Sequence, residues 1–377
     1  MATARIRAGP VAVTPSVSLS NVGIDTNVFN AWTDPKTDFT ATITPQADAW
    51  LRAGRARLTV HGSLSYVYFA TYRHERAVNT DDSIRLDLPF RRIRPYVGYS
   101  YLNIRERPGF EIDTRARRSE DVFFGGVDLP LTRKFTLGAS WRTTRTAFRA
   151  DEQFNNTYLR DVFNRRTSIL TGSVRYALTP LTTLVLQAET VRERFEFSPV
   201  RDSDSVRILP GVEFNAAALV NGTARVGYRR FNMRSPGMPD YSGPIASVDV
   251  GYSLLGVTRF ALSVSRDVAY SYEIQSPYYV ATGIAATVTQ HVGGPWSVLA
   301  RGGRQRLAYH DAQSAPGMTP PQQNRTDTVR FYGGGVGYRV SPNARLGFNV
   351  DYYTRESPVV LHNYRSLRAG TSVTYGF

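Results

Sequence analysis

The chain has 377 residues, no cysteine and a formal net charge of +15, carried almost entirely by arginine because Lys36 and Lys134 are the only lysines. The lack of cysteine excludes disulfide bridges, thiolate metal sites and cysteine nucleophiles. No run of about 18 apolar residues occurs, which excludes a transmembrane helix. A mean hydropathy of −0.30 is still compatible with a membrane β-barrel, because barrel strands alternate apolar residues with polar residues that face the lumen.

Segments in which apolar and polar residues alternate with a period of two follow one another along the chain, and this pattern predicts β-strands. The predicted strands cover about 13–22, 37–52, 56–72, 80–90, 93–104, 119–129, 134–147, 164–177, 182–196, 204–218, 223–233, 245–254, 258–271, 278–290, 295–308, 326–340, 344–355 and 366–377. In the second strand, Phe39, Ile43 and Leu51 share one face, and Thr40 and Thr44 share the other.

The connections between these strands alternate between short turns and mostly longer loops. One short turn is predicted at Leu219 to Gly222, because its Asn-Gly pair tolerates positive φ. Eighteen strands with this rhythm predict an all-β chain that forms a single 18-stranded antiparallel up-and-down transmembrane β-barrel over residues 13–377. The even number of strands puts both termini on the short-turn side, which we expect to be periplasmic. Residues 1–12 are expected to be an unpaired periplasmic segment before the barrel.

A pair of soluble β-sandwiches is the alternative fold. Most of the predicted strands are much longer than the 5–6 residues or so of a typical soluble strand. They match the length of about 9–11 residues that a tilted strand needs to cross the hydrocarbon. No linker or change in composition divides the chain into two parts, so the sequence favours the barrel.

Each predicted strand has an apolar face for lipid and a polar face for the lumen. Phe135, Leu137 and Trp141 illustrate the lipid face, where an isolated charge would cost roughly 2–4 kcal/mol at the midplane. The predicted pore-lining residues are Arg94, Arg142, Arg175, Arg207, Arg225, Arg229, Arg301, Arg339, Arg345, Arg368, Asp87, Glu189, Glu213, Asp249 and Asp351. The surplus of arginine over acid predicts a positive lumen that favours anions. For any single residue, the alternative is a static arginine–carboxylate ladder that keeps the barrel round.

The sequence gives little sign of a catalytic or metal site. The five histidines lack metal-binding spacings, so no metal or cofactor is expected. His61 and Ser63 share a polar strand face, but the serine lacks a nucleophile context. We therefore do not expect an enzyme, and a rim esterase is kept only as a third hypothesis. The arginines are spread singly, which argues against nucleic acid as a partner.

The location expected from this pattern is the bacterial outer membrane, with outer-membrane lipid and lipopolysaccharide as partners. The 22 tyrosines and 19 phenylalanines suit the aromatic girdles of such barrels. Residues 1–7 lack the apolar core of a signal peptide, so this expectation assumes that the sequence corresponds to the mature chain.

Two short stretches resemble a known family. Residues 15–29 read PSVSLSNVGIDTNVF, an alternating strand followed by an Asp-x-Asn-hydrophobic-aromatic stretch at Asp25 to Phe29, and the chain ends on Phe377. These features resemble the putative β-barrel porin 2 outer-membrane proteins. The resemblance implies an association with exopolysaccharide synthesis and export, and it carries no catalytic motif. The arginine-rich lumen is also similar in kind to that of alginate-export porins, which share the 18-strand layout.

Two functions follow as hypotheses. The first is a channel that passes an anionic polysaccharide or another anionic solute through the arginine-rich lumen. The second is a structural barrel, plugged by its loops or by a periplasmic partner, that anchors a larger cell-envelope complex.

Overall fold

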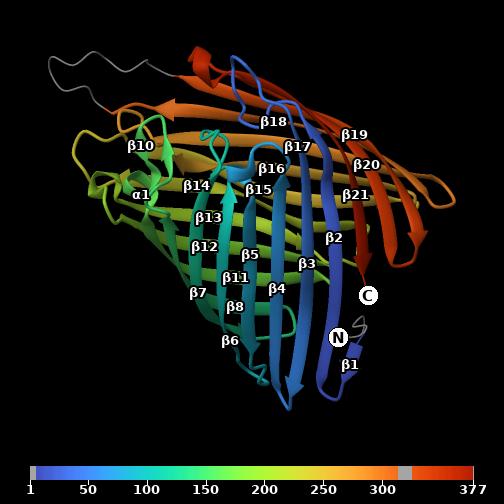
Figure 1. Ribbon diagram of the computed structural model, residues 1–377. Helices are drawn as coiled ribbons and strands as arrows, with labels where there is room; N and C mark the ends of the chain where they lie inside the picture. The colour runs from blue at the N-terminus through green and yellow to red at the C-terminus, as the bar shows by residue number, and fades with distance from the viewer. Residues whose placement is uncertain (1–5, 313–324, 377) are drawn as a thin grey trace.

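The structure, a computed structural model, describes residues 6–312 and 325–376. Nineteen of the strands in this part belong to one antiparallel sheet. Its last strand, β21 (Tyr364–Gly376), pairs with β2 (Val11–Asp25), so that the eighteen strands other than β1 close into a barrel (Figure 1). This confirms the predicted 18-stranded antiparallel barrel and makes the two-sandwich alternative wrong.

The other wall strands follow in chain order, each paired with its neighbours. They are β3 (Asp38–Ala53), β4 (Ala56–Phe69), β5 (Ala77–Asp87), β6 (Arg94–Glu106), β7 (Ala116–Pro130), β8 (Phe135–Phe148), β11 (Arg165–Thr179), β12 (Thr182–Phe195), β13 (Ser203–Phe214), β14 (Val220–Met233), β15 (Tyr241–Leu254), β16 (Thr258–Tyr270), β17 (Tyr278–Gly293), β18 (Trp296–His310), β19 (Thr326–Ser341) and β20 (Ala344–Glu356). The predicted strands match this series one to one, with ends that differ by a few residues.

Short elements decorate the loops between the wall strands. They are η1 (Arg73–Glu75), β9 (Gln153–Phe154), β10 (Thr157–Tyr158), α1 (Leu159–Phe163), η2 (Pro199–Arg201) and η3 (Val360–His362). Within residues 6–312 and 325–376, no helix is long and apolar enough to cross a membrane.

Two local predictions were wrong. Residues 6–8 were expected to be unpaired, but β1 (Ile6–Ala8) pairs with the first residues of β2, which already begins at Val11. The turn between β13 and β14 lies at 215–219, and Gly222 pairs with Val250 inside β14. Gly222 does have a φ of +113°, but a Cβ there would lie 2.0 Å from the carbonyl oxygen of Asp249. The glycine therefore serves a close approach of two strands and not a turn. Phe377, the predicted terminal aromatic residue of the last strand, lies outside the described residues.

The two ends of the barrel differ. One end carries connections as short as 54–55 and 342–343, and we call it the short-turn end. The other end carries longer connections, among them 107–115 and 357–363, and we call it the loop end. β1 and the last residues of β21 both lie at the short-turn end (Figure 1).

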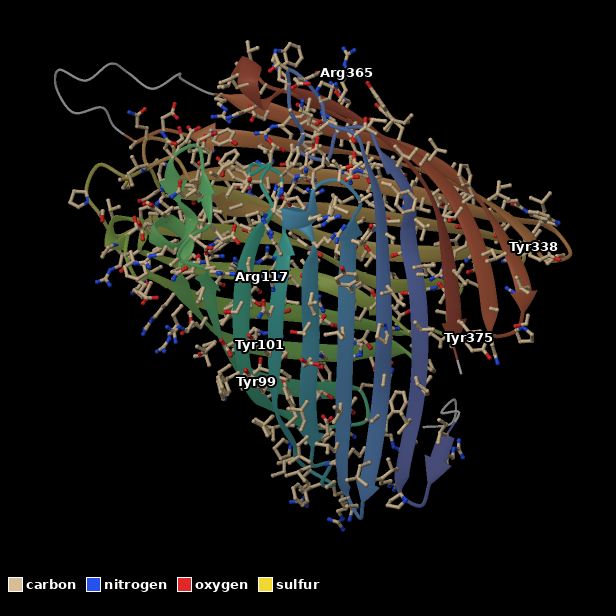
Figure 2. The ribbon with its side chains drawn as sticks, viewed as in Figure 1. Tyr99, Tyr101, Arg117, Tyr338, Arg365 and Tyr375 are labelled. Atoms are coloured by element: carbon tan, nitrogen blue, oxygen red, sulfur yellow. The ribbon has the colours of Figure 1, made fainter. Side chains whose placement is uncertain are left out.

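The outer face of the wall is apolar. Leu186 is 50% exposed, Phe348 is 49% exposed and Trp141 is 47% exposed, although large apolar side chains are normally buried. Tyr338 and Tyr375 lie near the short-turn end of the same outer face (Figure 2). Exposed apolar side chains bordered by tyrosine suit a surface that contacts lipid.

Two adjacent glycines in β19 offer a test of how tightly the wall is packed. A Cβ on Gly335 would lie 2.6 Å from the backbone oxygen of Phe348, whereas a Cβ on Gly334 would lie 3.5 Å from the nearest atom, the carbonyl oxygen of Leu299. We expect Gly335→Ala to destabilise the barrel by about 1–3 kcal/mol, because the backbone of the next strand must shift. Gly334→Ala should leave stability unchanged or slightly raised. The unfolding temperature in detergent, followed by the heat-modifiable gel shift, measures both, and equal effects would contradict this account.

Candidate functional site

The predicted pore-lining residues all lie on the inner face of the wall, opposite the exposed apolar residues. In β12, for example, Leu184 and Leu186 face outward, whereas Glu189 has the opposite parity and contacts Arg207 of the neighbouring strand at 3.6 Å. The same alternation assigns the inner face to Arg94, Arg142, Arg175, Arg207, Arg225, Arg229, Arg301, Arg339, Arg345, Arg368, Asp87, Glu189, Glu213, Asp249 and Asp351. Their part in conduction stays a prediction.

Six of the ten predicted arginines are paired with carboxylates across the lumen wall. The pairs are Arg175 with Asp128 at 2.8 Å, Arg207 with Asp267 at 3.2 Å, Arg225 with Glu213, Arg229 with Asp267 at 2.7 Å, Arg301 with Asp351 at 2.6 Å and Arg368 with Asp25 at 3.0 Å. These six arginines therefore form the static arginine–carboxylate ladder that was the alternative to a free lining of the pore. The surplus of positive charge therefore comes from the other arginines.

The remaining four, Arg94, Arg142, Arg339 and Arg345, form no ion pair within 4 Å among the described residues, although Arg94 lies opposite Asp128, which pairs with Arg175. Arg142 lies over the ring of Phe124 at 5.6 Å, and Arg345 donates to Ser297 Oγ at 3.0 Å. Asp87 is paired with Arg85 at 2.8 Å. Apart from Arg142, the unpaired arginines lie at the short-turn end.

Three further unpaired inner-face arginines lie at the same end, and the sequence analysis missed them although strand parity was sufficient to find them. The six residues together are Arg52, Arg57, Arg94, Arg259, Arg339 and Arg345, which we call the mouth arginines. Arg52 lies directly opposite Arg57, and Arg339 directly opposite Arg345. Like charges that face each other across two strands are destabilising unless an anion lies between them.

The loop end is spanned by protein. Six wall strands on one side and eight on the other separate the hairpins β6–β7 and β16–β17, so their loops start from nearly opposite sides of the barrel. These loops nevertheless touch, because Ser271 Oγ donates to Glu111 Oε1 at 2.6 Å and the Tyr272 amide donates to Glu111 Oε2 at 3.2 Å. We call the segments 26–31, 107–115 and 271–277 the loop plug.

The first segment of the loop plug joins the second through guanidinium groups. Arg107 and Arg115 both donate to the carbonyl oxygen of Val28, at 2.8 and 2.7 Å, and Asn30 donates to Asp113 at 2.9 Å. Burial, together with the charge of Arg115, lowers the pKa of Arg107 to about 10. The group stays charged at neutral pH.

A buried ion network ties the loop plug to the wall. The Arg355 guanidinium contacts Asp327 at 2.6 Å and Asp113 at 3.0 Å, and it donates to the Glu111 carbonyl at 3.0 Å. Arg325 contacts the same Asp327 at 3.0 Å and His362 at 2.7 Å. Both side chains of the Arg355–Asp327 pair are fully buried. Removing one partner of such a pair leaves an uncompensated charge, so the network holds the plug in one position.

The Glu111 carboxyl is the buried acid of the plug. Burial raises its pKa from 4.5 to about 7, an effect that its bond from Ser271 only partly opposes. Arg201, which is also fully buried, donates to the Tyr272 carbonyl at 3.0 Å and to the Ser271 carbonyl. The plug therefore contains an acid, Glu111, whose charge changes near neutral pH.

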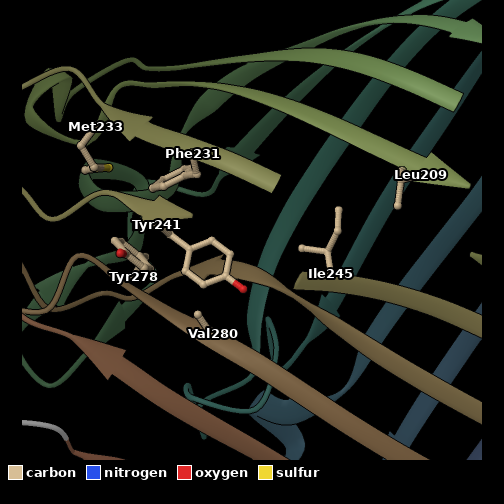
Figure 3. Packing of buried hydrophobic residues seen from close by; sticks show 7 residues of the cluster. All are labelled: Leu209, Phe231, Met233, Tyr241, Ile245, Tyr278 and Val280. Atoms are coloured by element: carbon tan, nitrogen blue, oxygen red, sulfur yellow. The ribbon is translucent and has the colours of Figure 1, made fainter. Parts of the chain in front are cut away.

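Apolar clusters support the plug from inside the barrel. Ile112 of the plug packs with Leu159 and Phe163 of α1. A second cluster, shown in Figure 3, joins residues of β13, β14, β15 and β17 next to the loop 271–277. Its members are Leu209, Phe231, Met233, Tyr241, Ile245, Tyr278 and Val280. Apolar packing therefore holds the loop plug in place together with the ion pairs and hydrogen bonds.

A polar cavity of about 860 Å³ lies in the lumen against the plug. Its lining includes plug arginines, ion pairs of the wall and hydroxyl groups, among them Arg107, Arg115, Arg301, Asp351, Arg368, Thr42 and Ser65. A cavity with this lining holds hydrated polar or anionic groups and not an apolar ligand.

The residues of the loop plug were not predicted as functional, because they lie in polar loops that were expected to be exposed to solvent. His61 and Ser63 have the same parity on β4, as expected, and His61 contacts Asp48 of the neighbouring strand at 2.8 Å. In the part of the chain that the structure describes, no group of three or more acidic or histidine side chains is arranged to hold a metal ion.

Comparison with known proteins agrees with this geometry. The chain superposes on the BenF-like porin from Pseudomonas fluorescens Pf-5 with a TM-score of 0.52 and 10% identity, over 98% of each chain. It superposes on the outer membrane protein opdK from Pseudomonas aeruginosa with a TM-score of 0.51 and 11% identity, over 97% of this chain and 98% of that one. At such identities the likeness concerns the fold. Among curated proteins, none matches the sequence. Residues 2–375 match the family described as "Putative beta-barrel porin 2", and the chain therefore belongs to this family of porin-like outer-membrane β-barrels.

Proposed function

We propose that this porin-like barrel is an anion-selective channel that its anionic substrate approaches from the short-turn end. The observation that supports this proposal is the set of mouth arginines, which lack carboxylate partners among the described residues. A cluster of fixed cations at the mouth of a low-dielectric tube raises the local concentration of anions and repels cations. The short-turn end, with both termini, is proposed to face the periplasm.

The substrate class proposed is an anionic polysaccharide, or a smaller anionic solute of the same chemistry. Arginine binds carboxylates through a planar two-donor fork and releases its hydration water readily. Arginines on several neighbouring strands, from Arg339 and Arg345 to Arg52 and Arg57, offer repeated sites along the rim. A chain of regularly spaced carboxylates would contact several of them at once. The resemblance to exopolysaccharide-associated barrels supports the same substrate.

Ion selectivity tests the proposal. We expect the triple variant Arg94→Gln, Arg339→Gln and Arg345→Gln to lower the chloride-to-potassium permeability ratio about fivefold. This corresponds to the loss of about 1 kcal/mol, the energy of two unit charges about 4 Å apart in water. Reversal potentials in planar bilayers under a salt gradient measure the ratio.

A matched control removes the same charge from the outer face, through Arg166→Gln, Arg192→Gln and Arg230→Gln, three arginines that are exposed there. It should leave the ratio unchanged. The channel proposal would be contradicted by a wild-type barrel that prefers cations. It would also be contradicted if the triple variant of the mouth arginines kept the wild-type selectivity.

The second candidate function is a structural barrel within a larger envelope complex. The loop plug favours it, because protein spans the loop end. This candidate requires a barrel that conducts no ions under any condition and that copurifies with a stoichiometric partner. A barrel that conducts ions after the loop plug is displaced would favour the channel over the structural role.

A further inference from the structure

A second group of arginines lies on the outer face of the barrel near the loop end, on neighbouring strands from β8 to β14. We call it the outer arginine cluster. It consists of Arg145 on β8, Arg166 on β11, Arg192 and Arg194 on β12, Arg230 on β14 and Arg234 just after β14. All but Arg194 are exposed. Their strand parity matches that of the exposed apolar residues, so they point away from the lumen.

The protein neutralises the cluster only in part. Arg194 and Arg234 share Asp204, at 2.6 and 3.8 Å, and Arg194 also approaches Asp202 at 4.0 Å. Arg145, Arg166, Arg192 and Arg230 have no ion-pair partner within the described residues. Asp121, which lies opposite Arg145, accepts a hydrogen bond from the Tyr99 hydroxyl at 2.7 Å.

The arrangement also places like charges face to face. Arg166 lies directly opposite Arg145 on one side and directly opposite Arg194 on the other. Three guanidinium groups in one row across three strands repel one another. An anion held between them would remove this repulsion.

The cluster lies where the apolar outer face ends. On each strand the arginine stands on the loop side of a large exposed apolar residue: Arg145 beyond Trp141, Arg166 beyond Leu170, Arg192 beyond Leu186 and Arg230 beyond Tyr228. The hairpin β6–β7 shows the same order, with Arg117 on the loop side of Tyr101 and Tyr99 (Figure 2). The guanidinium groups therefore lie at the level where hydrocarbon gives way to polar headgroups.

Four arginines of the cluster line a groove. Its volume is about 530 Å³, and its lining includes Arg192, Arg194, Arg230 and Arg234 together with Asp204. Val206 also lines it, so that the groove continues toward the apolar face. A ligand for this site carries phosphate at one end and acyl chains at the other.

We propose that the outer arginine cluster binds the phosphate groups of lipopolysaccharide. Arginine forms two parallel hydrogen bonds to phosphate oxygens, and a glycolipid whose disaccharide carries one phosphate at each end could contact arginines of adjacent strands. Its acyl chains would lie along Leu170, Leu186 and Val206. The proposal requires the loop end to face the outer leaflet, and it is independent of what the lumen conducts.

The test uses the full chain purified in detergent. We expect the triple variant Arg166→Gln, Arg192→Gln and Arg230→Gln to bind added lipid A at least tenfold more weakly than the wild type, as measured by native mass spectrometry. The control carries Arg94→Gln, Arg339→Gln and Arg345→Gln, which remove the same charge from the mouth, and it should bind like the wild type. The heat-modifiable gel shift shows whether each barrel is folded.

A second readout separates lipid binding from a purely structural role. Lipid A should raise the unfolding temperature of the wild type and of the mouth variant, but not that of the outer variant. Phosphatidylglycerol, which carries one phosphate, is the comparison lipid. Equal lipid A binding by both triple variants, or a selective loss of phosphatidylglycerol binding alone, would overturn the proposal.

Discussion

Replacing Asp327 by asparagine should unseat the loop plug and raise the single-channel conductance of the barrel. Asp327 is the shared partner of Arg325 and Arg355, and none of the three side chains is more than 5% exposed. Removing one member of a buried ion pair costs about 3–5 kcal/mol. A loss of about 3 kcal/mol shifts the balance between the seated and the displaced plug by more than a hundredfold.

Single-channel recording in planar bilayers measures this effect. Glu356→Gln is the matched control, because Glu356 lies next to Arg355 on the neighbouring strand β20 but forms its ion pair with Arg330 on the outer face. The control should conduct like the wild type. An Asp327→Asn barrel that is folded, by its gel shift, and still conducts like the wild type would show that the plug does not limit the current.

Conductance should also rise with pH, and Glu111 should be the group responsible. Burial raises the pKa of Glu111 from 4.5 to about 7 in the seated plug. The seated plug therefore holds the proton more tightly than a displaced, solvated plug does. The seated plug is therefore most stable below about pH 4.5. Its stability relative to the displaced plug falls as the pH rises from about 4.5 to about 7, and above about pH 7 it is lower by about 3 kcal/mol.

The groups around Glu111 set the size of this effect. Glu273 raises the pKa of Glu111 further, whereas Arg325 and the bond from Ser271 lower it. The pKa of the nearby Asp113 is also raised by burial, so it acts in the same direction. We expect higher open probability at pH 8 than at pH 5 in the wild type.

Two variants complete the pH experiment. Glu111→Gln keeps the shape of the side chain but cannot ionise, so its open probability should stay low and vary much less with pH. Glu106→Gln, at the exposed end of β6, should retain the wild-type dependence. A wild-type channel whose open probability is the same at both pH values would count against the role of Glu111.

The wall of the barrel could be predicted from the sequence because it follows a local rule. Alternation with a period of two determines both the strand and the face on which each side chain lies. The same rule would also have found the mouth arginines Arg52, Arg57 and Arg259, and it would have separated the outer arginine cluster from the lumen. The Asn-Gly prediction failed because the freedom of glycine at positive φ serves a strand contact as well as a turn.

The loop plug could not be predicted in this way. Glu111 lies 160 positions from Ser271 and 244 positions from Arg355 in sequence, and several wall strands separate its hairpin from theirs. No local pattern distinguishes a buried loop carboxylate from a solvated one. The register of the strands also decides which inner-face arginines form ion pairs with carboxylates, and parity alone does not give the register.

The junction between β2 and β21 has a consequence for how the molecule assembles. Its contacts join positions about 341 residues apart, such as Ser366 Oγ and Asp25 Oδ1. Closing a chain segment of that length costs about 5 kcal/mol of conformational entropy, whereas every other neighbouring pair of wall strands is local. The seam should therefore form last. Until it does, two strand edges with free amide and carbonyl groups remain open to pairing with other chains, so aggregation should compete with closure of the barrel at this step.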